Sequence, residues 1–388
     1  MKEVINTEKI PIKSWATDLE EGPLEQSKNL ANLPFAFKHI ALMADAHLGY
    51  GMPIGGILAT EKVVVPNAVG VDIGCGMIAV KTTVKKEELG TETLKKIMSI
   101  IREKVPVGFK KHKEVCSINE MPDKLERGEL KIVREQFENA RKSLGTLGGG
   151  NHFIEIQKGD DEYIWIMIHS GSRNLGHKVC SHYNNIAKKL NEKWYSEVQA
   201  DLAFLPLDTK EGKDYIEEMN YCLEFAQKNR NKMMQEVTEA FLIHFPDIEF
   251  YEPINMNHND ARLENHFNKN VWVHRKGATR AFIGEKGIIP GSQGTYSYIV
   301  EGLGNPESFM SCSHGAGRQM GRKDAQRRLS LEEEKKKLDD KGIIHAIRNE
   351  KDLDEAPGAY KDIEEVMENQ KDLVKILVKL EPLGVVKG

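Results

Sequence analysis

The chain has 388 residues, of which 40% are hydrophobic and 29% charged, an ordinary composition for a globular protein with a large apolar core. Its formal net charge of -4 excludes a protein that grips nucleic acid through an overall basic field, but it leaves room for a local basic groove. The five cysteines include no Cys-x-x-Cys pair, so neither a zinc finger nor a disulfide framework is indicated. The N-terminus lacks the apolar core of a signal peptide, and no run reaches the ~20 apolar residues of a membrane helix, so we expect a cytosolic protein with reduced thiols.

Short strands and helices are predicted along the whole chain. Strands are expected where apolar or β-branched residues alternate or end at a turn: residues 39–43, 63–65, 77–83, 163–169, 271–273, 296–300 and 373–380. Helices are expected where helix formers carry apolar residues at helical spacing or charge on all sides: residues 91–103, 175–242 and 318–338. Strands at both ends of the chain enclose a helix-rich stretch. This order favours an α+β core in which distant segments pair, forming one catalytic domain over residues 1–388 with a helix-rich insert at about 174–248.

Several glycine turns carry side chains that can bind a metal ion. Glycine lets the backbone turn sharply and approach a ligand closely. Asp72 and Cys75 lie on either side of such a turn, so a carboxylate and a thiolate can face one ion. Histidines in other glycine-rich segments would complete a mixed nitrogen, oxygen and sulfur set: His152, His169 and His274. Such a set suits a divalent transition metal, and paired ions suit phosphoryl transfer.

Each of these residues also has an ordinary structural interpretation. A histidine at a strand end is more often a satisfied polar residue than a ligand, and a lone cysteine is usually a small buried hydrophobe. We expect the other histidines of the helix-rich region and the polar loop to have surface, packing or substrate roles without binding metal: His177, His182, His244, His258 and His266. Only the combination of ligands, brought together by the fold, predicts a metal centre.

His314 differs from the other histidines in its setting. Small residues and glycines flank it, and Arg318 follows four positions later in the sequence. An imidazole nitrogen can attack phosphorus and form a phosphoramidate, and a guanidinium can neutralise phosphate oxygens with paired donors. A structural histidine in a turn explains the same local sequence equally well, so both interpretations stay open at this point.

Taken together, these segments resemble the RNA-splicing ligase RtcB family. The matching motifs follow one another in order from Asp45 to the last residue: 45–56 (Asp-Ala-His-Leu-Gly-Tyr-Gly-Met-Pro-Ile-Gly-Gly), 70–77 (Gly-Val-Asp-Ile-Gly-Cys-Gly-Met), 147–155 (Leu-Gly-Gly-Gly-Asn-His-Phe-Ile-Glu), 169–173 (His-Ser-Gly-Ser-Arg), 274–278 (His-Arg-Lys-Gly-Ala), 290–296 (Pro-Gly-Ser-Gln-Gly-Thr-Tyr), 313–318 (Ser-His-Gly-Ala-Gly-Arg), 355–362 (Glu-Ala-Pro-Gly-Ala-Tyr-Lys-Asp) and 386–388 (Val-Lys-Gly). The resemblance implies an α+β fold of central sheets wrapped by helices, with one deep active site.

The resemblance also implies roles for individual residues. The implied ligands of two manganese ions, with Cys75 bridging them, are Asp72, Cys75, His152, His169 and His274. His314 resembles the guanylylated nucleophile of the family, and Asp45 is a candidate base for the attacking hydroxyl. The implied nucleotide-binding residues are Asn151, Glu155, Arg173, Ser292, Arg318, Tyr360 and Lys387. Among them Glu155 would read the guanine edge, and Asn151 and Arg173 would contact phosphates.

The implied reaction uses GTP to join two RNA ends in tRNA splicing or RNA repair. An RNA 3′-phosphate, or a 2′,3′-cyclic phosphate after hydrolysis, would be activated by GMP and attacked by a 5′-hydroxyl end. An activating partner protein is compatible with the sequence. Two alternatives are a metal-dependent phosphoesterase acting on RNA ends, which GTP-dependent labelling would distinguish, and a non-catalytic RNA-binding factor, which would need neither the metal set nor His314.

The chain departs from the family pattern at a few places. Ala44 stands where proline is expected, and Gln293, residues 321–323 and the charged region at 329–352 are unusual. These positions concern RNA choice or the rim of the nucleotide site more than the metal set. They are compatible with a divergent member that has a special RNA target.

Overall fold

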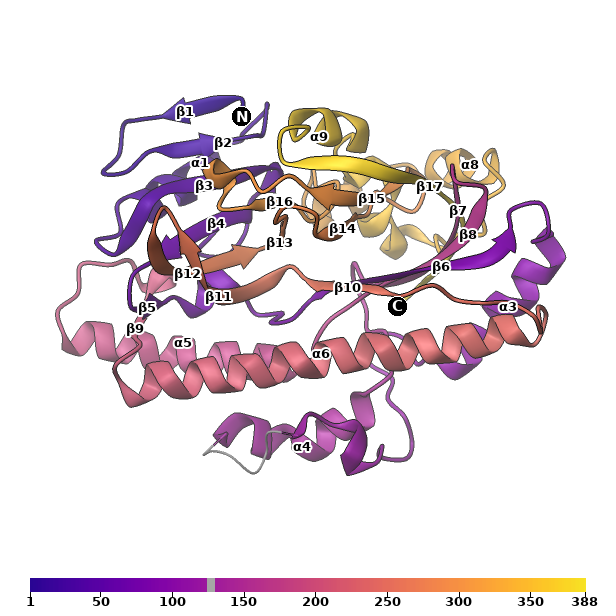
Figure 1. The fold of residues 1–388 in the computed structure, drawn as a ribbon, viewed down its shortest axis with the longest axis horizontal. Helices are drawn as coiled ribbons and strands as arrows, with labels where there is room; N and C mark the ends of the chain where they lie inside the picture. Colours follow the sequence, from indigo (N-terminus) through magenta and orange to yellow (C-terminus); the bar gives the residue numbers. More distant parts are fainter. Residues whose placement is uncertain (124–129) are drawn as a thin grey trace.

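Two β-sheets form the centre of the computed structural model, which describes residues 1–123 and 130–388 (Figure 1). The six-stranded sheet has the spatial order β1 (Glu3–Ile5), β2 (Ile12–Ser14), β3 (Ala36–His47), β4 (Ile54–Thr60), β12 (Lys269–Lys276) and β11 (Asn259–His266). The seven-stranded sheet has the order β10 (Ile254–Asn257), β6 (Gly76–Lys85), β8 (Tyr163–Ser170), β7 (Phe153–Gly159), β17 (Val374–Lys387), β15 (Ser297–Gly302) and β14 (Lys286–Ile289). Both sheets therefore combine strands from distant parts of the chain.

Two small ladders and a set of helices complete the architecture. The ladders pair β5 (Val63–Val64) with β9 (Leu205–Pro206) and β13 (Ala278–Arg280) with β16 (Ser311–Ser313). The α-helices are α1 (Glu21–Ala31), α2 (Pro66–Val69), α3 (Thr91–Lys104), α4 (Lys131–Ser143), α5 (Leu175–Lys193), α6 (Lys210–Leu242), α7 (Arg322–Arg328), α8 (Leu331–Asp339) and α9 (Ile363–Asn369). The 3-10 helices are η1 (Ile118–Glu120), η3 (Ala200–Leu202), η4 (Pro306–Ser308), η5 (Glu350–Glu355) and η6 (Pro357–Ala359).

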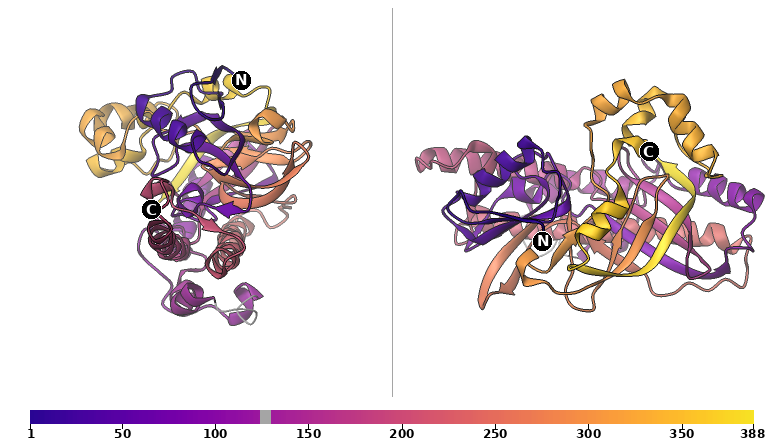
Figure 2. Two further views of the ribbon diagram at one scale, coloured as in Figure 1. Left: turned by 90° about the vertical axis from the view of Figure 1, so that its left-hand side faces the viewer. Right: turned by 90° about the horizontal axis from the view of Figure 1, so that it is seen from above.

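The long helix α6 connects the cores of the molecule. It runs across Figure 1 beneath strands of both sheets, and Figure 2 shows it end-on beside a second long helix. Its first half buries Met219 and Cys222 in one apolar cluster, and its second half buries Val237 and Phe241 in another. Because one rigid helix serves both clusters, we propose that the whole chain is a single catalytic domain.

The predicted α+β fold is confirmed, and most predicted elements lie where the sequence indicates. The helix expected at 91–103 is α3, and the strand expected at 163–169 is β8. The charged helix predicted at 318–338 is wrong as one element. The chain is extended at Leu329, and Ser330 then caps α8 by accepting a hydrogen bond from the Glu333 backbone N–H, which divides the stretch into α7 and α8. Residues 318–321 stay outside both helices, because Arg318 forms a β-bridge with Tyr360.

Glu218 on α6 should be important for stability, because it caps a neighbouring helix from a buried position. Its carboxylate accepts hydrogen bonds from the backbone N–H groups of Ile132 and Val133, at 3.1 and 3.0 Å, in the first turn of α4. Glu218→Ala would leave these buried donors unpaired, so we expect the free energy of unfolding to fall by about 2–4 kcal/mol. Denaturant unfolding measures this loss. The exposed neighbour Glu217→Ala is the matched control, and an equal loss in both variants would contradict the capping role.

Candidate active site

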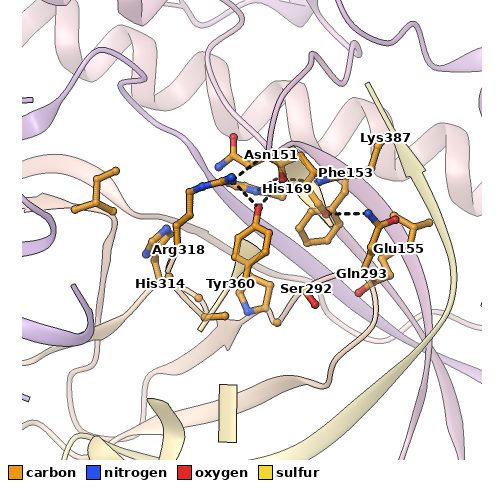
Figure 3. Close-up of a pocket in the computed structure, with 18 of the residues that line it drawn as sticks. Asn151, Phe153, Glu155, His169, Ser292, Gln293, His314, Arg318, Tyr360 and Lys387 are labelled. Carbon is orange, nitrogen blue, oxygen red and sulfur yellow. Dashed lines mark hydrogen bonds and ion pairs between the residues drawn. The ribbon is translucent and has the colours of Figure 1, made fainter. Parts of the chain in front are cut away.

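One pocket collects most of the predicted nucleotide-binding residues (Figure 3). Its walls come from the start of β7, the end of β17, the loop after β16 and the segment around η6. The predicted site residues that line it are Asn151, Glu155, His169, Ser292, His314, Arg318, Tyr360 and Lys387. In Figure 3, His314 and Arg318 lie at one end and Glu155 and Lys387 at the other, with Tyr360 between them.

Cys75, His152 and His169 form a buried cluster beside this pocket. Their candidate ligand atoms all lie within 4.8 Å of one another. Cys75 Sγ is 3.4 Å from His152 Nε2 and 3.2 Å from His169 Nε2. Asp72 adds a carboxylate oxygen 3.3 Å from His152 Nε2. This mixed donor set fits a divalent transition metal, and it opens to the pocket through His169.

Backbone carbonyls orient the histidines of the cluster. His152 Nδ1 donates to the Leu147 carbonyl at 2.9 Å, and His169 Nδ1 donates to the Asn151 carbonyl at 3.1 Å, which leaves each Nε2 facing Cys75. A second partner of this kind fixes the tautomer and the direction of a metal-binding imidazole. Burial, reinforced by the neighbouring histidines, also lowers the pKa of His169 well below its usual range. The ring is therefore neutral at physiological pH, the form that binds metal.

Two residues of α6 hold the loops that carry these ligands. The buried Arg230 guanidinium donates to the Gly74 and Ser170 carbonyls at 2.9 and 3.0 Å, and to Asn257 Oδ1 at 2.7 Å. Its neighbour Asn229 bonds the Gly145 and Thr146 backbone N–H groups and the Gly171 carbonyl. Gly74 and Ser170 are the direct neighbours of Cys75 and His169, and Gly145 and Thr146 begin the segment that leads to His152. The helix thus fixes the relative positions of segments that the chain order separates.

His314 is held by a buried carboxylate. Its Nδ1 lies 2.7 Å from Asp45 Oδ2, and the same oxygen accepts the backbone N–H groups of His314 and Gly315 at 3.1 and 3.3 Å. Asp45 is fully buried at the end of β3. This contact leaves Nε2, on the other side of the ring, as the nitrogen that can act as a nucleophile in the pocket.

Opposite charges meet along the wall of the pocket that includes Tyr360. Lys387 Nζ lies 2.7 Å from Glu355 Oε2, and the guanidinium groups of Arg318 and Arg322 lie 3.2 and 2.8 Å from Glu355 Oε1. Burial alone would raise the pKa of the Glu355 carboxyl, but Lys387 and Arg322 outweigh it and hold that pKa at about 2. Glu355 therefore stays ionised and fixes the cations at the pocket wall.

Glu155, by contrast, has no cation within ion-pair distance among the described residues. Burial raises the pKa of its carboxyl to about 8, although Gln157 donates a hydrogen bond to it and Lys387 lowers the pKa from a greater distance. A buried carboxyl whose one side-chain donor is an uncharged amide is suited to a ligand that supplies further donors.

A family model described as tRNA-splicing ligase RtcB matches residues 26–388. The chain belongs to the RtcB family. It is 39% identical to the RNA-splicing ligase RtcB of Escherichia coli (strain K12), over 100% of this chain and 99% of that protein. It is 34% identical to the tRNA-splicing ligase RtcB of Methanococcus maripaludis, over 96% and 92% of the two chains. It is 32% identical to the RNA-splicing ligase RtcB homolog 1 of Entamoeba dispar, over 94% and 82%.

The structure of this RtcB-family chain does not support the predicted metal-binding role of His274. The ring is fully buried within the six-stranded sheet, and backbone groups occupy both nitrogens. Nδ1 lies 3.1 Å from the Leu58 carbonyl, and Nε2 accepts the Val65 N–H at 3.0 Å. No ring nitrogen is left for an ion, so His274 stabilises the strands.

His258, which we expected not to bind metal, takes its place beside the cluster. Its Nε2 lies 3.3 Å from His169 Nε2, and its ring centre lies 4.8 Å from that of His314. Burial, with the nearby histidines, lowers the pKa of His258 well below its usual range. In the sequence His258 lies in a polar loop, and nothing there shows that this loop joins strands of two different sheets.

Two further predicted residues have contacts that differ from their expected roles. Asp45 is fully buried against His314 and does not line the pocket, so we assign it to orienting His314 instead of acting as a base for an RNA hydroxyl. Arg173 lies outside the pocket lining and donates to Thr146 Oγ1 at 3.0 Å and to the Gly108 carbonyl at 3.2 Å. A phosphate contact by Arg173 stays a prediction.

No helix within residues 1–123 and 130–388 has the length and apolar composition needed to cross a lipid bilayer.

The assignment of His258, in place of His274, as a candidate metal ligand can be tested with a matched pair of variants. His258→Gln should lower the manganese bound per folded chain after dialysis, because it removes a candidate ligand. His274→Gln should keep the metal content and lower the free energy of unfolding by about 1–3 kcal/mol, because the Val65 N–H loses its acceptor. Elemental analysis and thermal unfolding measure the two quantities. Loss of metal only in His274→Gln would reverse the assignment.

Proposed function

We propose that this protein is an RNA ligase that joins an RNA 3′-phosphate end to a 5′-hydroxyl end through GMP carried on His314. The observation that carries the proposal is the setting of His314. Asp45 fixes its Nδ1, and the ring lines a pocket beside the metal-competent cluster. Membership of a family whose named members are RNA- or tRNA-splicing ligases supports the same activity. RNA with a 3′-phosphate or 2′,3′-cyclic phosphate would be the substrate.

The first step is the transfer of GMP from GTP to the histidine. His314 Nε2 would attack the α-phosphorus, forming a P–N bond while the bond to the β-phosphate oxygen breaks and pyrophosphate leaves. Asp45 would hold the ring in the reactive tautomer and stabilise the positive charge that develops on it. Asn151 and Arg318, at the same end of the pocket, are placed to orient phosphate oxygens.

The remaining steps use GMP as a leaving group. An oxygen of the RNA 3′-phosphate would take GMP from His314, so that the P–N bond breaks and a mixed anhydride forms. The 5′-hydroxyl would then attack the RNA phosphorus, release GMP and make the phosphodiester; a cyclic phosphate needs prior hydrolysis. A metal pair, for which we propose two manganese ions held by Asp72, Cys75, His152, His169 and His258, would neutralise phosphate charge and orient the leaving group when bound.

The far end of the pocket would recognise the base. The Glu155 carboxyl can accept from the N–H groups on the guanine edge, which adenine does not present in that pattern. Lys387, Ser292 and Tyr360 line the same pocket and would bind the rest of the nucleoside. We therefore propose GTP as the nucleotide.

Replacing His314 tests the central claim. His314→Ala should abolish both GMP attachment and RNA joining while leaving the fold and metal content intact, because the variant removes the nucleophile and no metal ligand. The measurement is acid-labile protein-bound radiolabel after incubation of the purified chain with α-labelled GTP and manganese, followed by ligation of a 3′-phosphate RNA. Persistent labelling of His314→Ala would move the nucleophile elsewhere.

The same assay separates the competing functions. Hydrolysis of RNA ends by the intact chain, with no GMP labelling, would favour a metal-dependent phosphoesterase. Labelling that requires added cell extract would indicate an activating partner protein.

Glu155 should make GTP binding dependent on pH. Its pKa is about 8 in the free pocket, so the carboxyl is mostly protonated at pH 7 and must ionise to accept the guanine donors. GTP affinity should therefore rise with pH, by up to about tenfold per unit below pH 8, and level off above it. Calorimetry in the His314→Ala background avoids turnover. Glu155→Gln should bind GTP more weakly and without this rise, and ATP should bind poorly to the native pocket; equal binding of ATP and GTP would contradict the assignment.

A further inference from the structure

Phe109 is a fully exposed aromatic side chain close to the pocket. It lies on the turn after α3, and its relative exposure of 104% means that no part of the ring packs on the protein. An isolated apolar ring of this size in water contributes nothing to the core. The whole ring is therefore free to contact a molecule outside the chain.

The turn that presents Phe109 is held firmly. Gly108 has a φ of +66°, a conformation that favours glycine, and Lys110 N–H closes the turn on the Val107 carbonyl at 3.3 Å. The Gly108 N–H donates to the Gly148 carbonyl at 2.7 Å, and Arg173 donates to the Gly108 carbonyl at 3.2 Å. These bonds fix the backbone on both sides, so the ring projects from a rigid support.

The support is the glycine-rich loop at the edge of the active site. Gly148 is followed by Gly149, where a side chain would meet the Gly108 backbone at 3.6 Å, and then by Asn151, which lines the pocket. The loop also supplies the Leu147 carbonyl that orients His152. Phe109 therefore stands next to the loop that joins the nucleotide pocket to the metal-competent cluster.

Basic residues surround this position. Lys110, Lys111 and Lys113 follow Phe109 and are exposed. On the other side of the loop, a side chain at Gly150 would lie 3.2 Å from the guanidinium of Arg322, which begins the basic helix α7. An exposed aromatic ring beside cations is the arrangement that binds single-stranded nucleic acid, with a base on the ring and phosphates on the cations.

We propose that an unpaired base of the RNA, close to the end being joined, stacks on Phe109 while Lys110, Lys111 and Lys113 contact the adjoining phosphates. This inference rests on the proposed RNA ligase function. It also specifies the place where the RNA strand would leave the active site. Stacking on a ring tolerates any base, so the surface would hold the strand without selecting its sequence.

Binding of RNA to the full-length chain tests the proposed stacking of a base on Phe109. Phe109→Ala should raise the Kd for a single-stranded RNA carrying a 3′-phosphate or a 5′-hydroxyl end by at least about fivefold, as expected for the loss of one stacked base. Phe109→Trp should keep the Kd within about twofold. Fluorescence anisotropy gives the Kd, and 2-aminopurine near the RNA end should lose its stacking-dependent quenching in Phe109→Ala alone.

Controls separate this inference from the proposed function. Tyr195→Ala removes another exposed aromatic that lies outside the pocket lining, and it should leave RNA binding unchanged. GMP labelling of Phe109→Ala should match the native chain, because Phe109 does not line the nucleotide pocket. Replacing all three lysines with glutamine should flatten the salt dependence of log Kd by about 0.7 for each RNA phosphate that a lysine neutralises in the native complex.

Two outcomes would contradict the proposed stacking on Phe109. One is a native chain that takes GMP and joins RNA while Phe109→Ala binds both RNA ends with unchanged Kd. The other is self-association of the native chain that Phe109→Ala abolishes, because the ring would then belong to a protein interface. Failure of GMP labelling in the native chain would instead remove the proposed function itself.

Discussion

The buried guanidinium of Arg230 is the interaction on which the site depends. Burying a charged group is costly unless it is hydrogen-bonded, and each guanidinium nitrogen of Arg230 has an acceptor among the Gly74 and Ser170 carbonyls and the side chains of Asn255 and Asn257. Burial lowers its pKa only to about 10, so it keeps its charge at neutral pH. The rigid planar fork of arginine holds several acceptors in a fixed relation, which a flexible lysine would not do.

The contacts of Arg230 are important because the site lies where the two sheets meet. His258 is the single residue between β10 of the seven-stranded sheet and β11 of the six-stranded sheet. Cys75 comes just before β6, and His169 lies near the end of β8. Without a fixed junction, a small shift of one sheet would move His258 away from His169. Helix α6, which packs on both apolar clusters, supplies the rigidity that ligand geometry requires.

The charge distribution of the pocket is compatible with the nucleotide binding that we propose for this acidic protein. The net charge of -4 is an average over the whole surface. Locally, Arg318, Arg322 and Lys387 surround Glu355, so the wall carries more positive than negative charge. Glu155 forms no ion pair with these cations, although Lys387 lies at the same end of the pocket, and its carboxyl is mostly neutral at pH 7 until a ligand supplies donors. The pocket therefore has a phosphate-compatible end and an end suited to a base.

The sequence by itself predicted the α+β class, elements such as α3 and β8, and the ligand candidates Cys75, His152 and His169. These features depend on local causes: the period of apolar residues, the freedom of glycine at turns and the chemistry of each side chain. The order of motifs along the chain also indicated the family. By contrast, residues 318–321 stay outside the predicted helix because Arg318 pairs with Tyr360, a contact that only the fold makes.

Only the tertiary structure decided between His258 and His274. In the sequence His274 follows a predicted strand and precedes a glycine turn, whereas His258 lies in a polar loop, so the sequence favoured His274. The property that matters for metal binding is whether a ring nitrogen stays free. One ring nitrogen of His274 contacts the Leu58 carbonyl, which lies 216 positions away in the sequence. His258 instead faces His169 of the seven-stranded sheet. The partner of Asp45 is likewise set by the loop after β16. Local sequence can identify candidate ligands and catalytic residues. It cannot decide between them, because strand pairing between distant segments determines which groups they contact.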